Sequence, residues 1–392
     1  MTPRGLTGAT QVRRLAALAA TLIAVVALAA CGSSSDDSGG SASGTSDSGG
    51  AAASTTSGGD GASAPASLGK ITSILPSGPE LLPLYYQWAV AQEMGYWRDE
   101  GLDVELIGLG AGSASAIQQM VANKGDISVE TPAVVFDAAR EGYQDDLSII
   151  GNWFYKQGFD LRTYPDSPVQ KVEDLEGKKI GVSELAGGEV TLVRAAMAAH
   201  GVKDYELVPI GDGSAQTIKA LQDRAVDAYS TGERDFIGIE EAGVPMREIL
   251  IPEWEDLTAN VFTVRKDYLQ EHRDAVVAYM KGLAKAVVFA YANPEAAVRI
   301  AESVQKTRFP HSLVQRWVAQ TMRISVPREL VQRREIYAVP PGSLAGFLRF
   351  YAGAGQIDAD AIDVDSLEDP SLIPAINDFD QAAVEQQARD YR

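Results

Sequence analysis

The sequence predicts an α/β fold made of two lobes that are built alike. The main observation is an internal repeat at a spacing of 101 residues. Residues 102–128 read as an apolar segment, a glycine-rich turn and an amphipathic run, and the same order returns without a gap at residues 203–229. The second observation is that the apolar spacing changes from period 2 to period 3.6 across each turn, as a β-α-β unit requires.

The glycine-rich turns are the first candidate for a binding site. Gly110, Gly112 and Ser113 of the first copy align with Gly211, Gly213 and Ser214 of the second. Ligands of such units gather where strand ends meet helix N-termini, because free N–H groups and the helix dipole favour polar or anionic groups there. A strand stop and a helix cap would explain one copy alone. Two copies in register favour a ligand site that both lobes share.

The N-terminus is predicted to be an export signal. Arg13 and Arg14 precede the apolar run Leu15–Ala30, whose 16 residues are fewer than the ~20 that a membrane-spanning helix needs. The segment resembles a lipoprotein signal, residues 1–30, with cleavage before Cys31. Cys31 is the only cysteine, so an internal disulfide is excluded and lipidation of Cys31 is expected. A free thiol after an ordinary signal is the alternative, and the general secretory and twin-arginine routes both stay open.

Residues 31–67 are predicted to be a disordered tether between the membrane and the fold. They consist almost wholly of Gly, Ser, Ala and Thr and hold no large apolar residue that could offset the entropy of ordering. The formal charge of the chain is −19, which excludes a general nucleic-acid role and disfavours adsorption to anionic lipid. Membrane attachment therefore depends on the acyl chains of Cys31.

The elements of the folded part follow in order. We expect a strand at 70–75, a helix at 84–97 with a stop at Gly95, and a helix after Thr131-Pro132. The extended segments 159–163 and 260–264 are predicted to cross between the lobes, which gives 68–161 with 263–392 as lobe 1 and 162–262 as lobe 2. Residues 275–292 are strongly apolar, but Lys281 and Lys285 lie one turn apart, which predicts a packed helix and not a membrane span.

Enzymatic chemistry has little support in the sequence. The three histidines, His200, His272 and His311, each lie in a predicted helix or at a helix end, and nucleophile-elbow, zinc-protease and Walker motifs are absent. We therefore expect no catalytic residues, no metal and no cofactor.

Four segments carry a resemblance to a known family. Pro83-Leu84-Tyr85, Ala91–Trp97, Glu100–Glu105 and Leu175–Val182 resemble solute-binding proteins of ABC importers. The subfamily takes up nitrate, alkanesulfonates, taurine and thiamine pyrimidine precursors, and the resemblance covers about Lys70 to Asn293. It implies a two-lobed periplasmic-binding-protein fold of type II, a monomer that closes over a small molecule, and a permease with a cytoplasmic ATPase as partners. The related pyrimidine synthases carry a cysteine cluster, which this chain lacks.

By this resemblance the pocket lies between the lobes and is lined by turns that follow their strands. The candidate ligand-binding residues are Ser77, Leu82, Gly112, Ser113, Ala114, Glu130, Thr131, Trp153, Tyr155, Glu184, Gly187, Gly188, Glu189, Ser214 and Glu233, with Pro76 and Asp212 beside them. Glu233 occupies the place of the acidic residue in the family's Trp-Asp/Glu-Pro motif, but here neither Trp nor Pro flanks it.

The glutamates bear on the ligand. Carboxylates repel an anion in a poorly hydrated cleft, and Glu189 near a helix N-terminus would take the place that an anionic ligand needs. Trp153 offers a stacking face. This favours an amino-heterocycle, such as a thiamine pyrimidine precursor, or a cationic solute over a sulfonate or nitrate, which stay open. The alternatives are that the glutamates face solvent and Trp153 packs in the core, that the lipoprotein is a ligand sensor for a membrane receptor, or that it is a secreted hydrolase.

Overall fold

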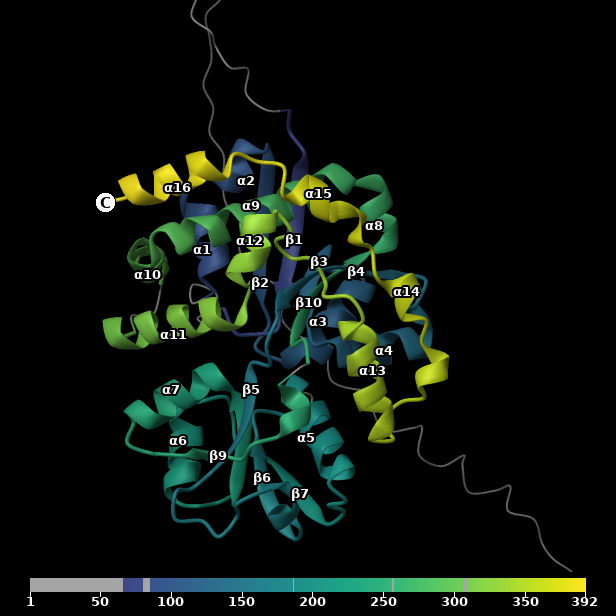
Figure 1. Cartoon of the computed structure of the whole chain (residues 1–392), viewed down its shortest axis with the longest axis vertical. Helices are drawn as coiled ribbons and strands as arrows, with labels where there is room; N and C mark the ends of the chain where they lie inside the picture. Colours follow the sequence, from purple (N-terminus) through teal and green to yellow (C-terminus); the bar gives the residue numbers. More distant parts are fainter. Residues whose placement is uncertain (1–65, 80–84, 186, 256, 306–308) are drawn as a thin grey trace, which may run out of the picture. The chain divides into compact units, whose positions relative to one another are not determined.

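Two five-stranded sheets with the same strand order form the two lobes (Figure 1). The computed structural model describes residues 66–392 apart from 80–84, 186, 256 and 306–308. The lobe 1 sheet runs β2 (Leu102–Gly108), β1 (Gly69–Leu75), β3 (Ile127–Glu130), β10 (Asn260–Arg265) and β4 (Leu147–Phe154). The lobe 2 sheet runs β7 (Tyr205–Pro209), β6 (Lys178–Val182), β8 (Ala228–Gly232), β5 (Phe159–Thr163) and β9 (Arg247–Glu248).

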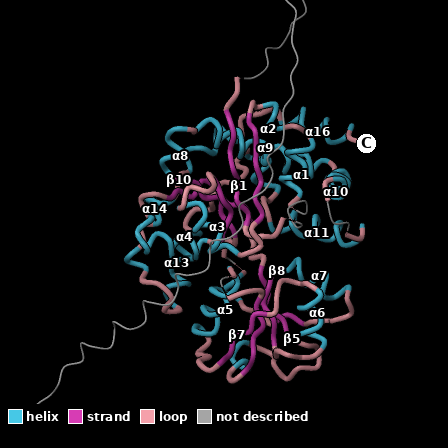
Figure 2. The backbone as a smooth tube through the Cα atoms, turned by 180° about the vertical axis from the view of Figure 1, so that it is seen from behind, coloured by secondary structure: helices cyan, strands magenta, loops and turns pink. Residues whose placement is uncertain are grey.

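Strand directions also agree between the lobes. In lobe 1, β1 is parallel to β2 and β3, and β10 is antiparallel to β3 and β4. In lobe 2, β6 is parallel to β7 and β8, and β5 is antiparallel to β8 and β9. Figure 2 shows the two sheets as separate groups of strands. The prediction of an α/β fold with two lobes built alike is confirmed.

Helices flank both sheets. Those before β10 are α1 (Tyr86–Glu93), α2 (Tyr96–Asp99), α3 (Gly112–Val121), α4 (Pro132–Ala138), α5 (Gly188–Ala199), α6 (Ala215–Gln222) and α7 (Glu233–Glu241). Those after it are α8 (Lys266–Glu271), α9 (Arg273–Ala292), α10 (Pro294–Ser303), α11 (His311–Ile324), α12 (Arg328–Arg333), α13 (Ser343–Gly353), α14 (Val364–Leu367), α15 (Ile373–Ile376) and α16 (Gln381–Asp390). The two copies of the repeat are β2-α3-β3 and β7-α6-β8. Gly110, Gly112, Gly211 and Gly213 all have positive φ, which explains why glycine recurs at these turn positions.

The crossings between lobes differ from the predicted boundaries by a few residues. All of β5 pairs within the lobe 2 sheet and all of β10 within the lobe 1 sheet. The chain therefore passes between lobes at 155–158 and before residue 260, and the boundary does not fall inside either strand. Apolar alternation predicts a strand but does not identify the strand with which it pairs, so the sequence gives the position of a crossing only to within a few residues. The predicted signal, Cys31 and the tether up to residue 65 lie outside the described residues.

Helix α9 is the centre of the lobe 1 core. By length and mean hydropathy it is apolar enough to span a membrane, but 72% of its apolar window is buried within the fold. Trp97 stacks on Tyr279 of α9 with ring centroids 5.7 Å apart and donates to the Tyr279 carbonyl at 2.9 Å. Gly282 makes this approach possible, since a Cβ there would lie 2.3 Å from the indole. Lys281 and Lys285 pair with Glu100 at 3.5 and 2.6 Å.

The lobes contact each other through two kinds of surface. On one side α5 of lobe 2 packs in an apolar cluster with α3, α4 and α13 of lobe 1, to which Leu192, Met120 and Phe347 belong. On the other side α11 of lobe 1 meets α7 of lobe 2 through polar groups. There Arg316 pairs with Glu240 at 3.3 Å, and Trp317 donates to the Arg234 carbonyl at 2.8 Å.

Candidate ligand-binding site

A cavity of about 330 Å³ lies between the lobes, where the strands of both sheets end. Lobe 1 contributes Pro76, Ser77, Tyr85, Gly110, Gly112, Ser113, Trp153, Phe154, Asn260, Gln320, Thr321 and Ile324. Lobe 2 and the crossing before it contribute Gly158, Phe159, Ser183, Glu184, Gly187, Gly188, Glu189, Gly211, Asp212, Thr231, Gly232, Arg234 and Asp235. Because the carboxyl ends of parallel strands meet at one edge of a sheet, the turns after β1, β2, β6 and β7 all reach this cavity.

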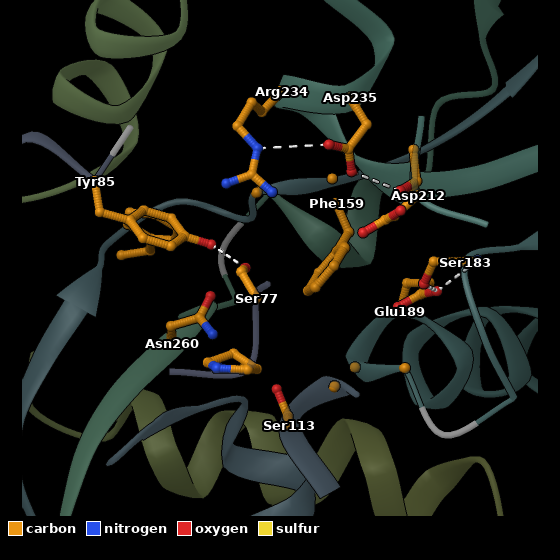
Figure 3. Close-up of a pocket in the computed structure, with 18 of the residues that line it drawn as sticks. Ser77, Tyr85, Ser113, Phe159, Ser183, Glu189, Asp212, Arg234, Asp235 and Asn260 are labelled. Carbon is orange, nitrogen blue, oxygen red and sulfur yellow. Dashed lines mark hydrogen bonds and ion pairs between the residues drawn. The ribbon is translucent and has the colours of Figure 1, made fainter. Parts of the chain in front are cut away.

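Arg234 is the cation of the cavity lining. It lies in the first turn of α7, and its Nε donates to Asp235 at 3.4 Å. Its guanidinium carbon lies 5.3 Å from the centre of the Tyr85 ring, on the opposite lobe. Figure 3 shows the terminal nitrogens directed into the cavity. Asp235 also accepts from Thr231 at 2.8 Å, so its carboxylate is held by two neighbours.

Glu189 is the best anchored carboxyl in the cavity. It accepts hydrogen bonds from the Ser183 amide at 2.9 Å and from the Ser183 hydroxyl. Burial raises its pKa from 4.5 to about 6, and the Ser183 hydrogen bonds oppose that increase. Because these bonds occupy one carboxylate oxygen, Glu189 closes the turn after β6 as well as facing the cavity.

Glu184 and Asp212 are acidic side chains of a different kind. Within the described residues neither makes a hydrogen bond or an ion pair through its side chain. Burial raises the pKa of Glu184, and the negative charge of Asp212 raises it further. Both carboxyls line the same cavity, and no described cation pairs with either of them. Among the described residues, no group of three His, Cys, Asp or Glu side chains is placed to hold a metal ion.

Aromatic side chains form another part of the wall. Trp153 is buried, stacks on Phe154 at a centroid distance of 3.9 Å, and meets the edge of Tyr85 at 5.0 Å. Phe159 projects into the middle of the cavity in Figure 3. The cavity therefore combines flat apolar faces with carboxylates and the guanidinium of Arg234.

The structure brings together eight of the predicted residues and leaves six elsewhere. Those in the cavity lining are Ser77, Gly112, Ser113, Trp153, Glu184, Gly187, Gly188 and Glu189, and the neighbouring candidates Pro76 and Asp212 join them. Leu82 lies outside the described residues. Those outside the lining are Ala114, Glu130, Thr131, Tyr155, Ser214 and Glu233.

These six residues lie in other surroundings. Ala114 packs in the α3–α5 cluster, and Thr131 lies against Gly188, whose added Cβ would be 2.7 Å from the Thr131 methyl. Tyr155 donates to the Ala338 carbonyl at 2.6 Å, and Ser214 caps α6 by accepting from Thr217. The last two are the glutamates, which are described next.

Glu130 and Glu233 lie outside the cavity lining because their side chains point to other faces of β3 and α7. Glu130 is fully buried in β3 and accepts from Ser128, on the same face of the strand. Glu233 faces α11, where it pairs with Arg323 and accepts from Gln320 at 3.1 Å. Consecutive helix positions differ by about 100°, so the next residue, Arg234, faces the cavity instead. The sequence did not predict six residues of the lining: Arg234, Asp235, Tyr85, Phe159, Asn260 and Gln320. For Arg234 and Asp235 the signal in the sequence was their position directly after the candidate Glu233.

A family model described as NMT1/THI5 like matches residues 82–297, more than half of the chain. The chain belongs to the NMT1/THI5-like family. A Brucella abortus protein, whose name assigns it a binding function provisionally, is 26% identical over 223 residues. That match covers 54% of this chain and 65% of the Brucella protein, so the chain spans about two thirds of the length of the curated relatives it matches.

Solved structures share the fold of this NMT1/THI5-like protein at low sequence identity. A Bordetella bronchiseptica protein superposes with a TM-score of 0.65 at 18% identity, over 79% of this chain and 96% of that one. The alkanesulfonate-binding protein SsuA of Xanthomonas axonopodis, bound to MOPS, gives 0.57 at 15% identity, over 76% and 97%. A Candida albicans protein described as having the generic periplasmic binding protein fold gives 0.58 at 14%, over 77% and 96%. The predicted periplasmic-binding-protein fold is thereby confirmed.

Proposed function

We propose that this protein is the extracytoplasmic solute-binding component of an ABC importer, which captures a small organic molecule between its lobes. One observation carries the proposal: a cavity of about 330 Å³ that two sheets of like topology line with their strand ends. This volume is at the lower end of the roughly 300–1,000 Å³ typical of small-molecule sites. The family, the Brucella relative and the SsuA-like folds all support a binding role.

The mechanism follows from the position of the cavity. A ligand that touches both lobes binds the closed form better than the open form, so it shifts the population toward closure. The two crossings, at 155–158 and before β10, serve as the hinge. A membrane permease with its cytoplasmic ATPase then recognises the closed form. Catalysis has no part in this cycle.

We also propose that Cys31 carries the acyl chains that hold the protein at the outer face of the membrane. The basic start, the apolar run of 16 residues and the lone cysteine support this assignment. Mass spectrometry of the protein from membranes tests it: the mature N-terminus should be a lipid-modified Cys31, and an unmodified thiol would exclude it.

For the ligand, the composition of the cavity supports an amine-bearing heterocycle or organic cation over a simple sulfonate or nitrate. Four carboxyl groups and one guanidinium line it, together with Tyr85, Trp153 and Phe159. An inorganic anion would meet repulsion from the carboxylates that a poorly hydrated cavity screens little.

A thermal-shift and calorimetric screen tests the function and the ligand class together. The panel contains an aminopyrimidine, simple amines, taurine, an alkanesulfonate, MOPS and nitrate. A true ligand at 100 times its Kd should stabilise the protein by about 2.7 kcal/mol. Binding by the first two classes supports the proposal, and preference for taurine, sulfonate or nitrate refutes the ligand class alone. Chemical turnover of any panel member, detected by mass spectrometry, would refute the binding role and favour the hydrolase.

A further inference from the structure

The two lobes can be aligned residue by residue at the start of the turn that follows each first strand. Leu75 of β1 pairs with Gly108 of β2, and Val182 of β6 pairs with Pro209 of β7. Since positions 108 and 209 are one repeat spacing of 101 apart, Leu75 corresponds to Val182. Two residues further on, Ser77 corresponds to Glu184.

The same alignment shows where the acidic groups of the cavity lie. Asp212 stands one repeat spacing after Ala111, so its counterpart in lobe 1 is also uncharged. Both free carboxyls of the cavity, Glu184 and Asp212, thus belong to lobe 2, and the related positions of lobe 1 hold a serine and an alanine. The acidity is a departure from the repeat and not a property of the fold.

Lobe 1 faces these carboxyls with neutral polar groups. Asn260 is 8% exposed and Ser113 is 5% exposed, and both line the cavity. Within the described residues, neither side chain makes a hydrogen bond, and Figure 3 shows Ser113 directed into the cavity. Both side chains therefore offer donors and acceptors with which a ligand in the cavity can pair.

Arg234 pairs with Asp235, and not with Glu184 or Asp212. Its Nε is engaged by Asp235 at 3.4 Å, and its plane lies over Tyr85. Asp235 and Arg234 thus balance each other and leave Glu184 and Asp212 as uncompensated charges in the same cavity. Two carboxylates that line one cavity without a paired cation are stabilised by a cationic ligand group, through charge-assisted hydrogen bonds.

We infer, on the basis of the solute-binding function proposed above, that the ligand is an organic cation whose protonated amino or amidino group docks between Glu184 and Asp212 of lobe 2. Its uncharged polar end meets Ser113 and Asn260 when lobe 1 closes. Charge recognition belongs to lobe 2 alone, and lobe 1 reads the neutral part of the molecule.

The repeat itself supplies variants for the test. Glu184→Ser and Asp212→Ala each place in lobe 2 the residue that lobe 1 carries at the related position. The matched control is Glu206→Ala, which removes an exposed lobe 2 carboxylate that pairs only with Lys179 at 3.5 Å. The probes are ring compounds of one size and three charges: benzylamine, benzyl alcohol and benzoate. The full chain is titrated with each of them by calorimetry and by ligand-observed NMR, at matched pH and salt.

The expected order of affinity is benzylamine, then benzyl alcohol, then benzoate. Each of the two cavity variants should lower the affinity for benzylamine about tenfold or more, the range for loss of a charge-assisted hydrogen bond. The affinity of both variants for benzyl alcohol should stay that of the wild type. Glu206→Ala should leave all three unchanged. If benzyl alcohol or benzoate binds as well as benzylamine, the inference fails while the solute-binding function stands. If no probe and no member of the wider panel binds, both fail.

Discussion

Replacing Glu130 with glutamine removes a fully buried carboxyl from β3. Burial raises the pKa of Glu130 from 4.5 to about 8, and the hydrogen bond from Ser128 offsets only part of this. The folded chain therefore keeps a proton on this carboxyl at pH values where the unfolded chain has lost it. Stability that depends on this group is fully present below pH 4.5 and is lost as the pH rises to about 8.

The size of the effect follows from the two pKa values. At roughly 1.36 kcal/mol per pH unit, the wild-type chain should lose about 4 kcal/mol from this group between pH 5 and pH 8. Glutamine keeps the shape and can still accept from Ser128, but it does not titrate. The free energy of unfolding of Glu130→Gln, minus that of the wild type, should therefore increase by about 4 kcal/mol over this interval.

Urea denaturation followed by circular dichroism at pH 5 and pH 8 measures this difference. Subtracting the wild type cancels the titration of remote carboxyls. Glu295→Gln, at an exposed site in the first turn of α10, is the control and should show a change of less than about 1 kcal/mol. A difference for Glu130→Gln that does not vary with pH would refute the argument. Ligand affinity should not change, since Glu130 lies outside the cavity lining.

Three other changes test the closure and the core. Gly188→Ala should weaken ligand binding, because its Cβ would lie 2.7 Å from the Thr131 methyl of the opposite lobe. Calorimetry should show a lower affinity for this variant than for the control Gly238→Ala, whose Cβ meets open space. Equal affinities of the two variants would contradict the closed geometry. Asn377→Ala should lower the free energy of unfolding in urea by about 2–4 kcal/mol, because the buried Asn377 amide accepts from the Ile336 N–H at 2.9 Å and donates to the carbonyls of Ile336 and Ile373. A loss below about 1 kcal/mol would show that these hydrogen bonds are dispensable. Glu233→Gln should lower the free energy of unfolding by less than about 1 kcal/mol, because its partner Arg323 is half exposed. Added salt should reduce this difference between variant and wild type. A larger loss that does not depend on salt would contradict the prediction.

The sequence predicts the architecture better than the site. The repeat at 101 residues places β2-α3-β3 and β7-α6-β8 correctly, because both periodicity and turn glycines follow from local backbone geometry. The Asn293-Pro294 start of α10 is likewise local, because the Asn293 side chain accepts from the Ala296 amide at 3.0 Å.

The misses concern orientation and long-range pairing. A one-residue step along a strand or helix turns a side chain to another face, which is why Glu130 and Glu233 were chosen and Arg234 was not. Asn260 enters the cavity because β10 pairs with β3 and β4, and Gln320 because α11 packs on α7. These are tertiary facts without a signal in the local pattern.

The lobes contact each other at two edges, and separating them costs a different amount of free energy at each edge. Separating α5 from α3, α4 and α13 would expose apolar surface to water, at about 25 cal/mol for each Å². On the α7–α11 edge partly exposed ion pairs, each worth about 0–1 kcal/mol, stand beside the buried Trp317 and the apolar contact of Ile237. The proposed hinge crossing at 155–158 also lies on the α7–α11 edge, since the Glu233 amide donates to the Gly158 carbonyl at 2.8 Å. Opening about this crossing therefore separates the α5 edge, and the apolar surface exposed there favours the closed form in water.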